Sequence, residues 1–314
     1  MASSKTRAIA VFGSVNADVT GFCDRLPKPG ETVPGTRYSI ALGGKGANQA
    51  AAVARLDYPV QMIGCIGNDS FGLMARTSLG SLGVGRDHLV ASEKASTGVA
   101  LINVDAHAEN SIVVIAGANA AVDQTVIDHA AAALREAPIL LAQLEVPLVA
   151  SMTAAAKIRG NGGLVILDPA PAPSGGLSSD VLSAVDIVTP NETETEALVG
   201  VRPESSADAA AASKLLQSRG ATAVVIKLGR RGAYYRGRDA EGFVPPFTVK
   251  AINSVGAGDC FNGGLAVALA RGADLPKAVR FAAACGALAT TGKGGAEAAP
   301  TLAAVEALLE SQRN

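Results

Sequence analysis

The sequence predicts a three-layer α/β protein with a doubly wound, mostly parallel sheet. Short runs rich in Val, Ile and Leu recur along the 314 residues, and stretches with helical spacing lie between most of them. Strands that are apolar along their whole length are typical of a parallel sheet covered by helices on both faces. The regular alternation of strand and helix favours double winding. A chain of this length can bury a large core, as one domain or as two.

The predicted strands of the main sheet are the apolar runs at 8–13, 60–66, 138–144, 163–168, 185–189 and 222–228. The predicted helices are the stretches at 46–57, 70–81, 122–135, 147–159, 191–199, 207–219, 257–271, 275–291 and 300–312. Asp123, Pro147 and Pro276 lie near the starts of three of them, where capping residues and proline are favoured.

Two regions interrupt this alternation and predict a second, smaller sheet. Residues 18–40 are rich in proline, and residues 96–116 contain two β-like runs that predict a hairpin. Open α/β sheets bind ligands beyond the carboxyl ends of their strands, so a small sheet there would act as a lid. We therefore expect a main domain of residues 1–17, 41–95 and 117–314, and a discontinuous β lid of residues 18–40 and 96–116.

Composition argues against several classes of function. With 27 basic and 28 acidic residues, the chain has no general attraction for nucleic acid or for an anionic membrane surface. No apolar run reaches the ~18 residues of a membrane helix. The three histidines are too scattered for a metal cluster or a hydrolase triad. The cysteines form no C-x-x-C pair, which fits reduced thiols in the cytoplasm; they are Cys23, Cys65, Cys260 and Cys285.

The segment 253–259 places a carboxylate, Asp259, at the start of the predicted helix 257–271. Gly256 and Gly258 allow a sharp bend, and the first turn leaves N–H groups free at the positive end of the helix dipole. Such ends bind anions, including phosphate. Asp259 could therefore activate a hydroxyl beside a phosphate, or it could simply cap its helix.

Two further segments suit a polyhydroxylated ligand. The glycine-rich turn Gly43–Asn48 enters the predicted helix 46–57 and presents open N–H groups beside the carboxamide of Asn48. Asn16 and Asp18 follow the first strand, where short polar side chains can bind sugar hydroxyls. Each segment could instead be an ordinary turn. Neither a Walker A loop nor a dinucleotide-binding G-x-G-x-x-G is present.

Two more strand ends carry groups suited to a nucleotide. Asn191 and Glu194 lie three residues apart on one helix face, where an amide and a carboxylate suit hydrated magnesium; the same pair could be a capping box. The segment 227–232 ends a strand with cations and two glycines. It could hold phosphates, or it could be a solvated basic turn.

Taken together and in order, five segments closely resemble the ribokinase branch of the phosphofructokinase-B (PfkB) family of sugar kinases, from about residue 8 to 300. They are Gly13–Asp18, Gly43–Ala50, Gln143–Glu145, Asn191–Glu194 and Gly256–Asp259. Within the family, the ribokinase branch is favoured by G-G-K-G-A-N-Q-A and by the segments Ser96–Ala100, Ala116–Ala120 and Leu167–Ala172.

The resemblance implies a ribokinase-like fold and the ATP-dependent phosphorylation of the primary 5-hydroxyl of ribose, with Mg²⁺, in a dimer formed through the lids. It implies that Asp259 is the general base beside an anion hole of Gly256, Ala257 and Gly258. The implied sugar ligands are Asn16, Asp18, Gly44, Lys45, Gly46, Asn48, Glu145 and Asp259. The implied nucleotide contacts are Asn191, Lys227, Gly229, Gly232, Gly258 and Ala283, and Asn191 and Glu194 would organise Mg²⁺ through water.

One departure concerns a monovalent cation. The family usually has an Asp six positions before the base, where it helps to bind potassium, whereas this chain has Asn253. A neutral carboxamide is a weaker ligand for a cation that prefers charged oxygen. The later loop, 294–300, offers no hydroxyl in the usual place. A potassium site at Asn253 and Val255 is therefore doubtful, and we expect weak dependence on potassium.

Other substrates remain open at this stage: deoxyribose, a nucleoside, fructose or a ketoacid sugar. Seven Phe, four Tyr and no Trp leave few rings to stack a purine, which disfavours nucleosides. A sugar-binding or regulatory protein that kept the fold without turnover is the rival of another class, because fold does not determine function. The intact Asp259, Gly256, Gly258 and Glu194 argue against it.

Overall fold

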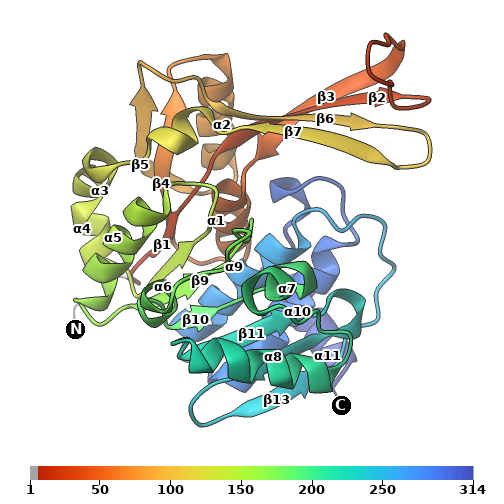
Figure 1. Ribbon diagram of the computed structural model, residues 1–314. Helices are drawn as coiled ribbons and strands as arrows, with labels where there is room; N and C mark the ends of the chain where they lie inside the picture. Colours follow the sequence, from red (N-terminus) through yellow and green to blue (C-terminus); the bar gives the residue numbers. More distant parts are fainter. Residues whose placement is uncertain (1–5, 314) are drawn as a thin grey trace.

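The structure is a computed structural model that describes residues 6–313, and its main sheet is mostly parallel, as predicted (Figure 1). The nine strands follow the order β13-β12-β11-β10-β9-β8-β1-β4-β5. The parallel strands are β1 (Ile9–Phe12), β4 (Val60–Gly67), β5 (Gly85–Ser92), β8 (Ile139–Ala142), β9 (Leu164–Leu167), β10 (Ile187–Val188) and β11 (Ala223–Lys227). Two antiparallel strands, β12 (Ala233–Arg236) and β13 (Glu241–Val244), extend one edge.

Helices cover both faces of this sheet, which confirms the three layers. Alternate residues of β1 enter two separate cores: Ile9 and Val11 one, Ala10 and Phe12 the other. The first core is packed by α1 (Lys45–Arg55), α2 (Ser70–Ser81), α9 (Ala257–Ala270), α10 (Leu275–Ala289) and α11 (Leu302–Ser311). The second is packed by α3 (Gln124–His129), α4 (Ala131–Glu136), α5 (Leu148–Arg159), α6 (Ser179–Ser183), α7 (Glu192–Val199) and α8 (Ser206–Ser218).

Two expectations about individual elements were wrong. The predicted helix 122–135 is two helices, α3 and α4, which meet at Ala130, whose φ of −95° and ψ of 7° interrupt the α conformation. The strands β5, β12 and β13 were not predicted. They lie toward the edges of the sheet and are partly exposed, so they lack the continuous apolar runs of the central strands.

The two regions that interrupt the alternation form one four-stranded sheet, which projects from the body (Figure 1). Its order is β3-β2-β6-β7, and the predicted hairpin of β6 and β7 is present. The strands are β2 (Asn16–Cys23), β3 (Gly35–Gly43), β6 (Gly98–Val104) and β7 (Asn110–Ile115). Because β2 starts at Asn16, almost directly after β1, the sugar-binding residues predicted there lie where the core strand passes into the small sheet.

The register of the small sheet assigns its residues to two different faces. Asp18 pairs with Ala41 and Ala100, so these residues share one face. The next residue, Val19, pairs with Ile40 and Leu101 on the opposite face. That opposite face carries exposed apolar side chains, of which the largest are Tyr38, Ile40, Leu101, Val113 and Ile115.

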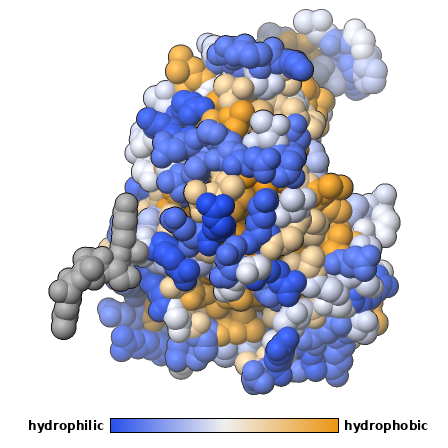
Figure 2. Space-filling model, turned by 90° about the vertical axis from the view of Figure 1, so that its left-hand side faces the viewer, coloured by the Kyte–Doolittle hydropathy of each residue, from blue (hydrophilic) through white to orange (hydrophobic). Residues whose placement is uncertain are grey.

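The surface of the main body is mixed. Hydrophilic residues dominate the face shown in Figure 2, and hydrophobic residues lie between them in separate patches. Among residues 6–313, the helices are too short or too polar to cross a membrane.

Candidate active site

The topology gathers the polar residues that follow the parallel strands at one edge of the sheet. The chain runs outward from β1 to β4 and β5, and then returns to β8 on the other side of β1. This reversal opens a crevice between β1 and β8, where doubly wound folds bind ligands. Ser14 after β1 and Glu145 after β8 meet across it, with Ser14 Oγ donating to Glu145 Oε2 at 2.5 Å.

Asn16 is held in place by Asn119, a residue to which the sequence analysis gave no role. Asn119 Nδ2 donates to Asn16 Oδ1 at 2.7 Å, and the Val15 N–H donates to Asn119 Oδ1 at 2.9 Å. Both carboxamides are at most 5% exposed. Asn119 lies in the 3₁₀ turn Gly117–Ala121, directly after the hairpin of the small sheet. Its burial between polar loops was not visible from local sequence.

The turn from β3 into α1 requires glycine because it packs directly on the loop after β1. Gly44 has a φ of 88°, and a Cβ on it would lie 2.9 Å from the Asn16 nitrogen. A Cβ on Gly46 would lie 2.7 Å from the Ser14 nitrogen. The Lys45 N–H donates to Glu145 Oε2 at 3.0 Å, so the turn is also bound to the end of β8. These contacts bring together the residues predicted from the glycine-rich turn and from β8.

Asp18 lies on the face of the small sheet that adjoins this turn, and its carboxylate occupies the space that a side chain at Gly43 would fill. Burial, followed by the negative charges of Glu145, Glu297 and Asp259, raises the pKa of Asp18 to about 6. Glu297 comes from the loop after α10 and was not among the predicted site residues. An ionised Asp18 offers acceptors to hydroxyl donors.

Asp259 lies in the first turn of α9 and is 6% exposed. Asn48 Nδ2 donates to its Oδ2 at 3.0 Å, and Gln49 Nε2 donates to its Oδ1 at 3.1 Å. Burial raises the pKa of Asp259 to about 6, although the positive charge of Lys45 lowers it. The alternative that Asp259 caps its own helix does not apply, because Gly256 is the N-cap residue of α9.

The first turn of α9 offers donors beside this carboxylate. Gly256 adopts the left-handed conformation, with a φ of 76°. The N–H groups of Gly258 and Asp259 have no acceptor among residues 6–313, whereas the Ala257 N–H donates to Ser254 O at 3.3 Å. Gly258, which was predicted for the anion hole, and Asp259 therefore have free N–H groups at the positive end of the helix dipole, whereas the predicted donor Ala257 is already bonded.

A buried ion pair approaches the same helix terminus. Lys227, at the end of β11, donates to Asp168 Oδ1 at 2.8 Å, and Asp168 follows β9. The Lys227 ammonium lies 3.6 Å from the position that a Cβ on Gly258 would occupy. The cation predicted for the nucleotide therefore lies close to Gly258, in the first turn of α9. Asp168, which was predicted only as part of a motif, holds it there.

Lys45 is a second cation in the crevice, near four acidic residues. These residues are Asp259, Asp168, Glu145 and Glu194. Burial opposes its charge, but the carboxylates of Asp259 and Asp168 outweigh this effect and, with Glu145 and Glu194, raise the pKa of Lys45. The ammonium therefore stays charged at any pH at which the protein would work.

Asn191 and Glu194 form the capping box of α7. Glu194 Oε2 accepts from the Asn191 N–H at 2.8 Å, and Asn191 Oδ1 accepts from the Glu194 N–H at 2.8 Å. Burial raises the pKa of Glu194, and Lys227 lowers it. The capping box that the sequence allowed for this pair is therefore present. The Glu194 carboxylate also lies near the charged groups of Lys227, Asp168 and Lys45.

The other residues predicted for the nucleotide lie around this terminus. Gly229 begins a short 3₁₀ turn after β11, and Gly232 follows it with a φ of 102°. Ala283 is on α10, one turn before Gly286, at which a Cβ would lie 3.1 Å from Ala257 O.

Comparison with known proteins decides the family. The model of the pfkB family carbohydrate kinases matches residues 6–302. This chain belongs to the pfkB family. A ribokinase from Haemophilus influenzae is 39% identical over 94% of this chain and 96% of its own length. A deoxyribokinase from Salmonella typhi is 35% identical over the same shares of the two chains.

Solved structures of the family share the whole fold. A structure of the Arabidopsis thaliana ribokinase complexed with ribose and ATP superposes with a TM-score of 0.91, at 32% identity, and covers 97% of this chain and 99% of that one. The fold is therefore ribokinase-like throughout, including the small sheet, and this family member has the architecture of a sugar phosphotransferase.

Proposed function

We propose that this protein uses ATP to phosphorylate the primary 5-hydroxyl of D-ribose, giving ribose 5-phosphate, with Asp259 as general base. The observation that carries the proposal is the buried Asp259 carboxylate, fixed by two carboxamides, directly beside the free N–H groups of Gly258 and Asp259. The ribokinases of similar sequence support the choice of sugar.

In this proposal the protein works mainly by positioning and by charge. Asp259 accepts the proton of the hydroxyl as its oxygen attacks the γ-phosphorus in line with the departing ADP. The N–H groups of Gly258 and Asp259, together with the Lys227 ammonium, stabilise negative charge on the transferring oxygens. A pKa of about 6 suits this base, because it is ionised at neutral pH and still basic enough to take the proton.

The sugar would lie between the small sheet and the turn into α1. The side chains of Asn16, Asp18 and Asn48 would exchange hydrogen bonds with the sugar hydroxyls. The backbone of Gly44, Lys45 and Gly46 would lie close to the sugar. Glu145 would act by fixing Ser14 and the Lys45 N–H, and its Oε2 accepts from both.

The residues present fit a hydrated Mg²⁺ that arrives with ATP. Each carboxylate oxygen of Glu194 accepts one hydrogen bond from Asn191, which leaves lone pairs free for ordered water. The described residues contain no group of three or more His, Cys, Asp or Glu that could hold a metal by themselves. Asn191 and Glu194 would therefore bind Mg²⁺ through water, and the ion would neutralise phosphate charge.

A coupled assay of ADP release, with ATP and Mg²⁺ and a panel of sugars, tests the proposed function. Ribose should give the highest kcat/KM, with 2-deoxyribose, fructose, a ketoacid sugar and adenosine as competitors. A preference for 2-deoxyribose would favour the activity named for the Salmonella typhi relative. No turnover with any sugar, in a sample that binds ribose by calorimetry, would instead support a sugar-binding protein.

We infer that potassium has little effect on the rate. Asn253 carries no charge, and its only side-chain oxygen accepts from the Val255 N–H at 3.0 Å, so the site does not fit a cation that needs a charged oxygen. Rates of enzyme freed of sodium and potassium should change little on addition of potassium, and Asn253→Asp should increase the response. A large activation of the unmodified protein would contradict this inference.

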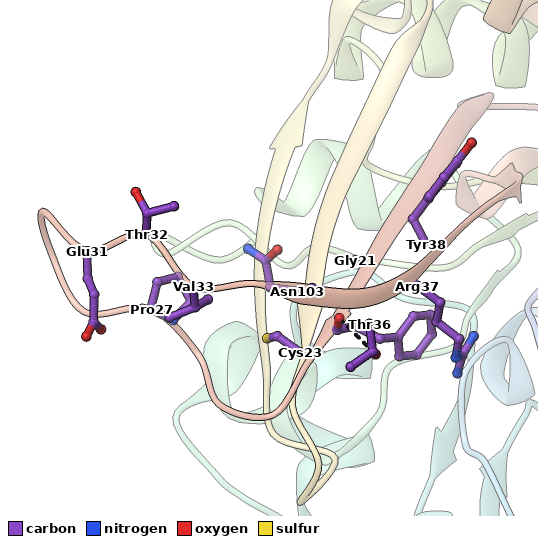
Figure 3. Close-up of a pocket in the computed structure, with 12 residues that line it drawn as sticks. Gly21, Cys23, Pro27, Glu31, Thr32, Val33, Thr36, Arg37, Tyr38 and Asn103 are labelled. Atoms are coloured by element: carbon purple, nitrogen blue, oxygen red, sulfur yellow. Dashed lines mark hydrogen bonds between the residues drawn. The ribbon is translucent and has the colours of Figure 1, made fainter.

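The small sheet supports our proposal of a homodimer formed through the lids. On its face opposite Asp18, Leu101 is 43% exposed and Val113 is 57% exposed. A second copy of the protein would cover these apolar side chains, which contact water in the monomer. Near the tip, a shallow cavity of about 650 Å³ is lined by Gly21, Phe22, Arg37 and Tyr38, with the Arg37 guanidinium 3.4 Å from the centre of the Phe22 ring (Figure 3).

Leu101→Glu should shift the protein toward monomer in sedimentation velocity. An unchanged distribution would argue for another interface or none.

A cytoplasmic location is part of the same proposal. Cys23, Cys65, Cys260 and Cys285 are all free thiols, as expected in a reducing compartment. Burial raises the pKa of Cys260 and Cys285, so these two thiols are poorly reactive. Fractionation of the source cells would test the location.

A further inference from the structure

The side chain of Gln49 lies between two buried carboxylates. Its Nε2 donates to Asp259 Oδ1 at 3.1 Å and to Asp168 Oδ2 at 3.0 Å. Gln49 is on α1, Asp259 on α9, and Asp168 follows β9, so one amide group connects three elements of the crevice. Gln49 is fully buried, at 0% exposure, and therefore cannot touch a sugar or a nucleotide in the open crevice.

Gln143 fixes which end of this amide faces the carboxylates. Its Nε2 donates to Gln49 Oε1 at 2.7 Å, and Gln143 is also fully buried, directly after β8. An amide flip of Gln49 would turn Oε1 toward two negatively charged groups and leave two N–H donors facing each other. The two carboxylates and Gln143 thus fix the orientation of the Gln49 amide together.

Asp259 needs neutral donors because no cation touches it. Asp168 forms an ion pair with Lys227, whereas the described residues include no ion pair to Asp259. The charged groups that face Asp259 are Lys45 on α1 and Asp168 after β9, and Asp18 lies across the crevice. Two carboxylates that share one buried region repel each other, so a donor shared between them stabilises both charges and holds them apart.

We propose that Gln49, held by Gln143, is a positioning residue that fixes the Asp259 carboxylate in its ionised form and directs its free lone pairs toward the substrate hydroxyl. This inference rests on the proposed role of Asp259 as the base. Asn48 Nδ2 donates to the other carboxylate oxygen, so Asn48 and Gln49 each fix one oxygen of the proposed base.

Gln49→Leu tests the inference, because leucine keeps most of the volume and removes the donor. Hydrogen bonds to charged groups contribute enough for kcat to fall roughly 10- to 100-fold. The ribose dissociation constant, measured by calorimetry, should stay near that of the unmodified protein. In a plot of kcat against pH, the acid limb is the fall of kcat as the pH drops and the base becomes protonated. This limb should move to higher pH, because the ionised base loses a hydrogen-bond donor. Gln143→Leu should change kcat and the acid limb in the same direction, by less.

Gln217→Leu is the matched control, since Gln217 lies on α8, on the outer layer of the fold, and among the described residues its side chain donates only to the Thr222 carbonyl. It should leave kcat and the pH profile unchanged. A Gln49→Leu protein with unchanged kcat and an unmoved acid limb would overturn the inference, and so would an equal loss of sugar binding and turnover. Gln49→Glu keeps the size and polarity of the side chain, and it should move the acid limb further upward because it adds a like charge. An unmoved limb in that variant would also overturn the inference.

Asp259→Asn separates the two proposals. If Asp259→Asn keeps its turnover, the proposed base is wrong, whatever the Gln49 variants do. If Asp259→Asn is inactive while Gln49→Leu is normal, only the inference about Gln49 fails.

Discussion

Asp259→Asn is expected to bind ribose with nearly unchanged affinity and to lose turnover by roughly 10² to 10⁴, the usual contribution of a general base. The carboxamide fills the same volume at the start of α9 but cannot take up the proton of the attacking hydroxyl. ADP release at saturating ribose measures kcat, and calorimetry measures sugar binding. Asp239→Asn, at an exposed position, is the control and should behave as the unmodified protein. Turnover near normal in Asp259→Asn would exclude this residue as the base.

The pH dependence of the unmodified protein belongs to the same prediction. Both Asp259 and Asp18 have pKa values of about 6, and the roles proposed for them require both to be ionised. The kcat/KM of the free enzyme should therefore be constant above that region and fall as the pH drops through about 6. The fall should be steeper than one proton would give, because two groups become protonated together.

Asp18→Ala is expected to have the opposite kinetic signature, with a much higher KM for ribose and a smaller change in kcat at saturation. Asp18 lies on the small sheet rather than on α9, and its partly buried carboxylate would accept from sugar hydroxyls. If two such bonds are lost, at about 1.5 to 3 kcal/mol each, KM should rise by roughly 100-fold or more.

Asp24→Ala controls for damage to the small sheet, because Asp24 is exposed just beyond β2. It should leave KM unchanged. If Asp18→Ala lowers kcat strongly and leaves KM as it was, Asp18 does not bind the sugar in the ground state. The two variants, Asp18→Ala and Asp259→Asn, therefore assign binding and chemistry to different carboxylates.

The main sheet could be predicted because its central strands are buried on both faces. The runs that contain Ile139–Ala142 and Leu164–Leu167 are apolar at nearly every position, which is typical of strands in a parallel sheet covered on both faces. The edge was harder to predict: Gly85–Ser92 mixes charged and apolar residues, because one side of this strand meets solvent. The interruption between helices α3 and α4 at Ala130 has no local signal, because the segment is rich in alanine. Ala130 and Leu134 are both buried in the second core, so the interruption goes with tertiary packing.

The arrangement of the candidate site could be predicted in part, where short motifs bring their own geometry, as with Gly44, Asn48 and Asp259, whose roles stay predictions. It was not predictable where the partner is remote in sequence, because spacing carries no information across 103 residues from Asn16 to Asn119. A weaker signal was available for Gln143, Asp168 and Lys227. Each is a polar residue at or directly after the end of an apolar strand, and in a parallel sheet such residues meet at one edge. Only the fold shows which of them touch.

The regular pairing of β2 from Asn16 to Phe22 has a consequence for insertions and deletions. Asp18 and Val19 point to opposite faces because they are neighbours in a strand, and the register shifts only between Phe22 and Cys23. Removing one residue before Asp18 would move every following side chain of β2 to the other face of the small sheet. Val19 would then point toward the proposed sugar site, and the Asp18 carboxylate would lie on the face with exposed apolar side chains. Lineages of this protein should therefore vary in length at residues 24–34, beyond the shift, and keep the length of residues 16–22 constant.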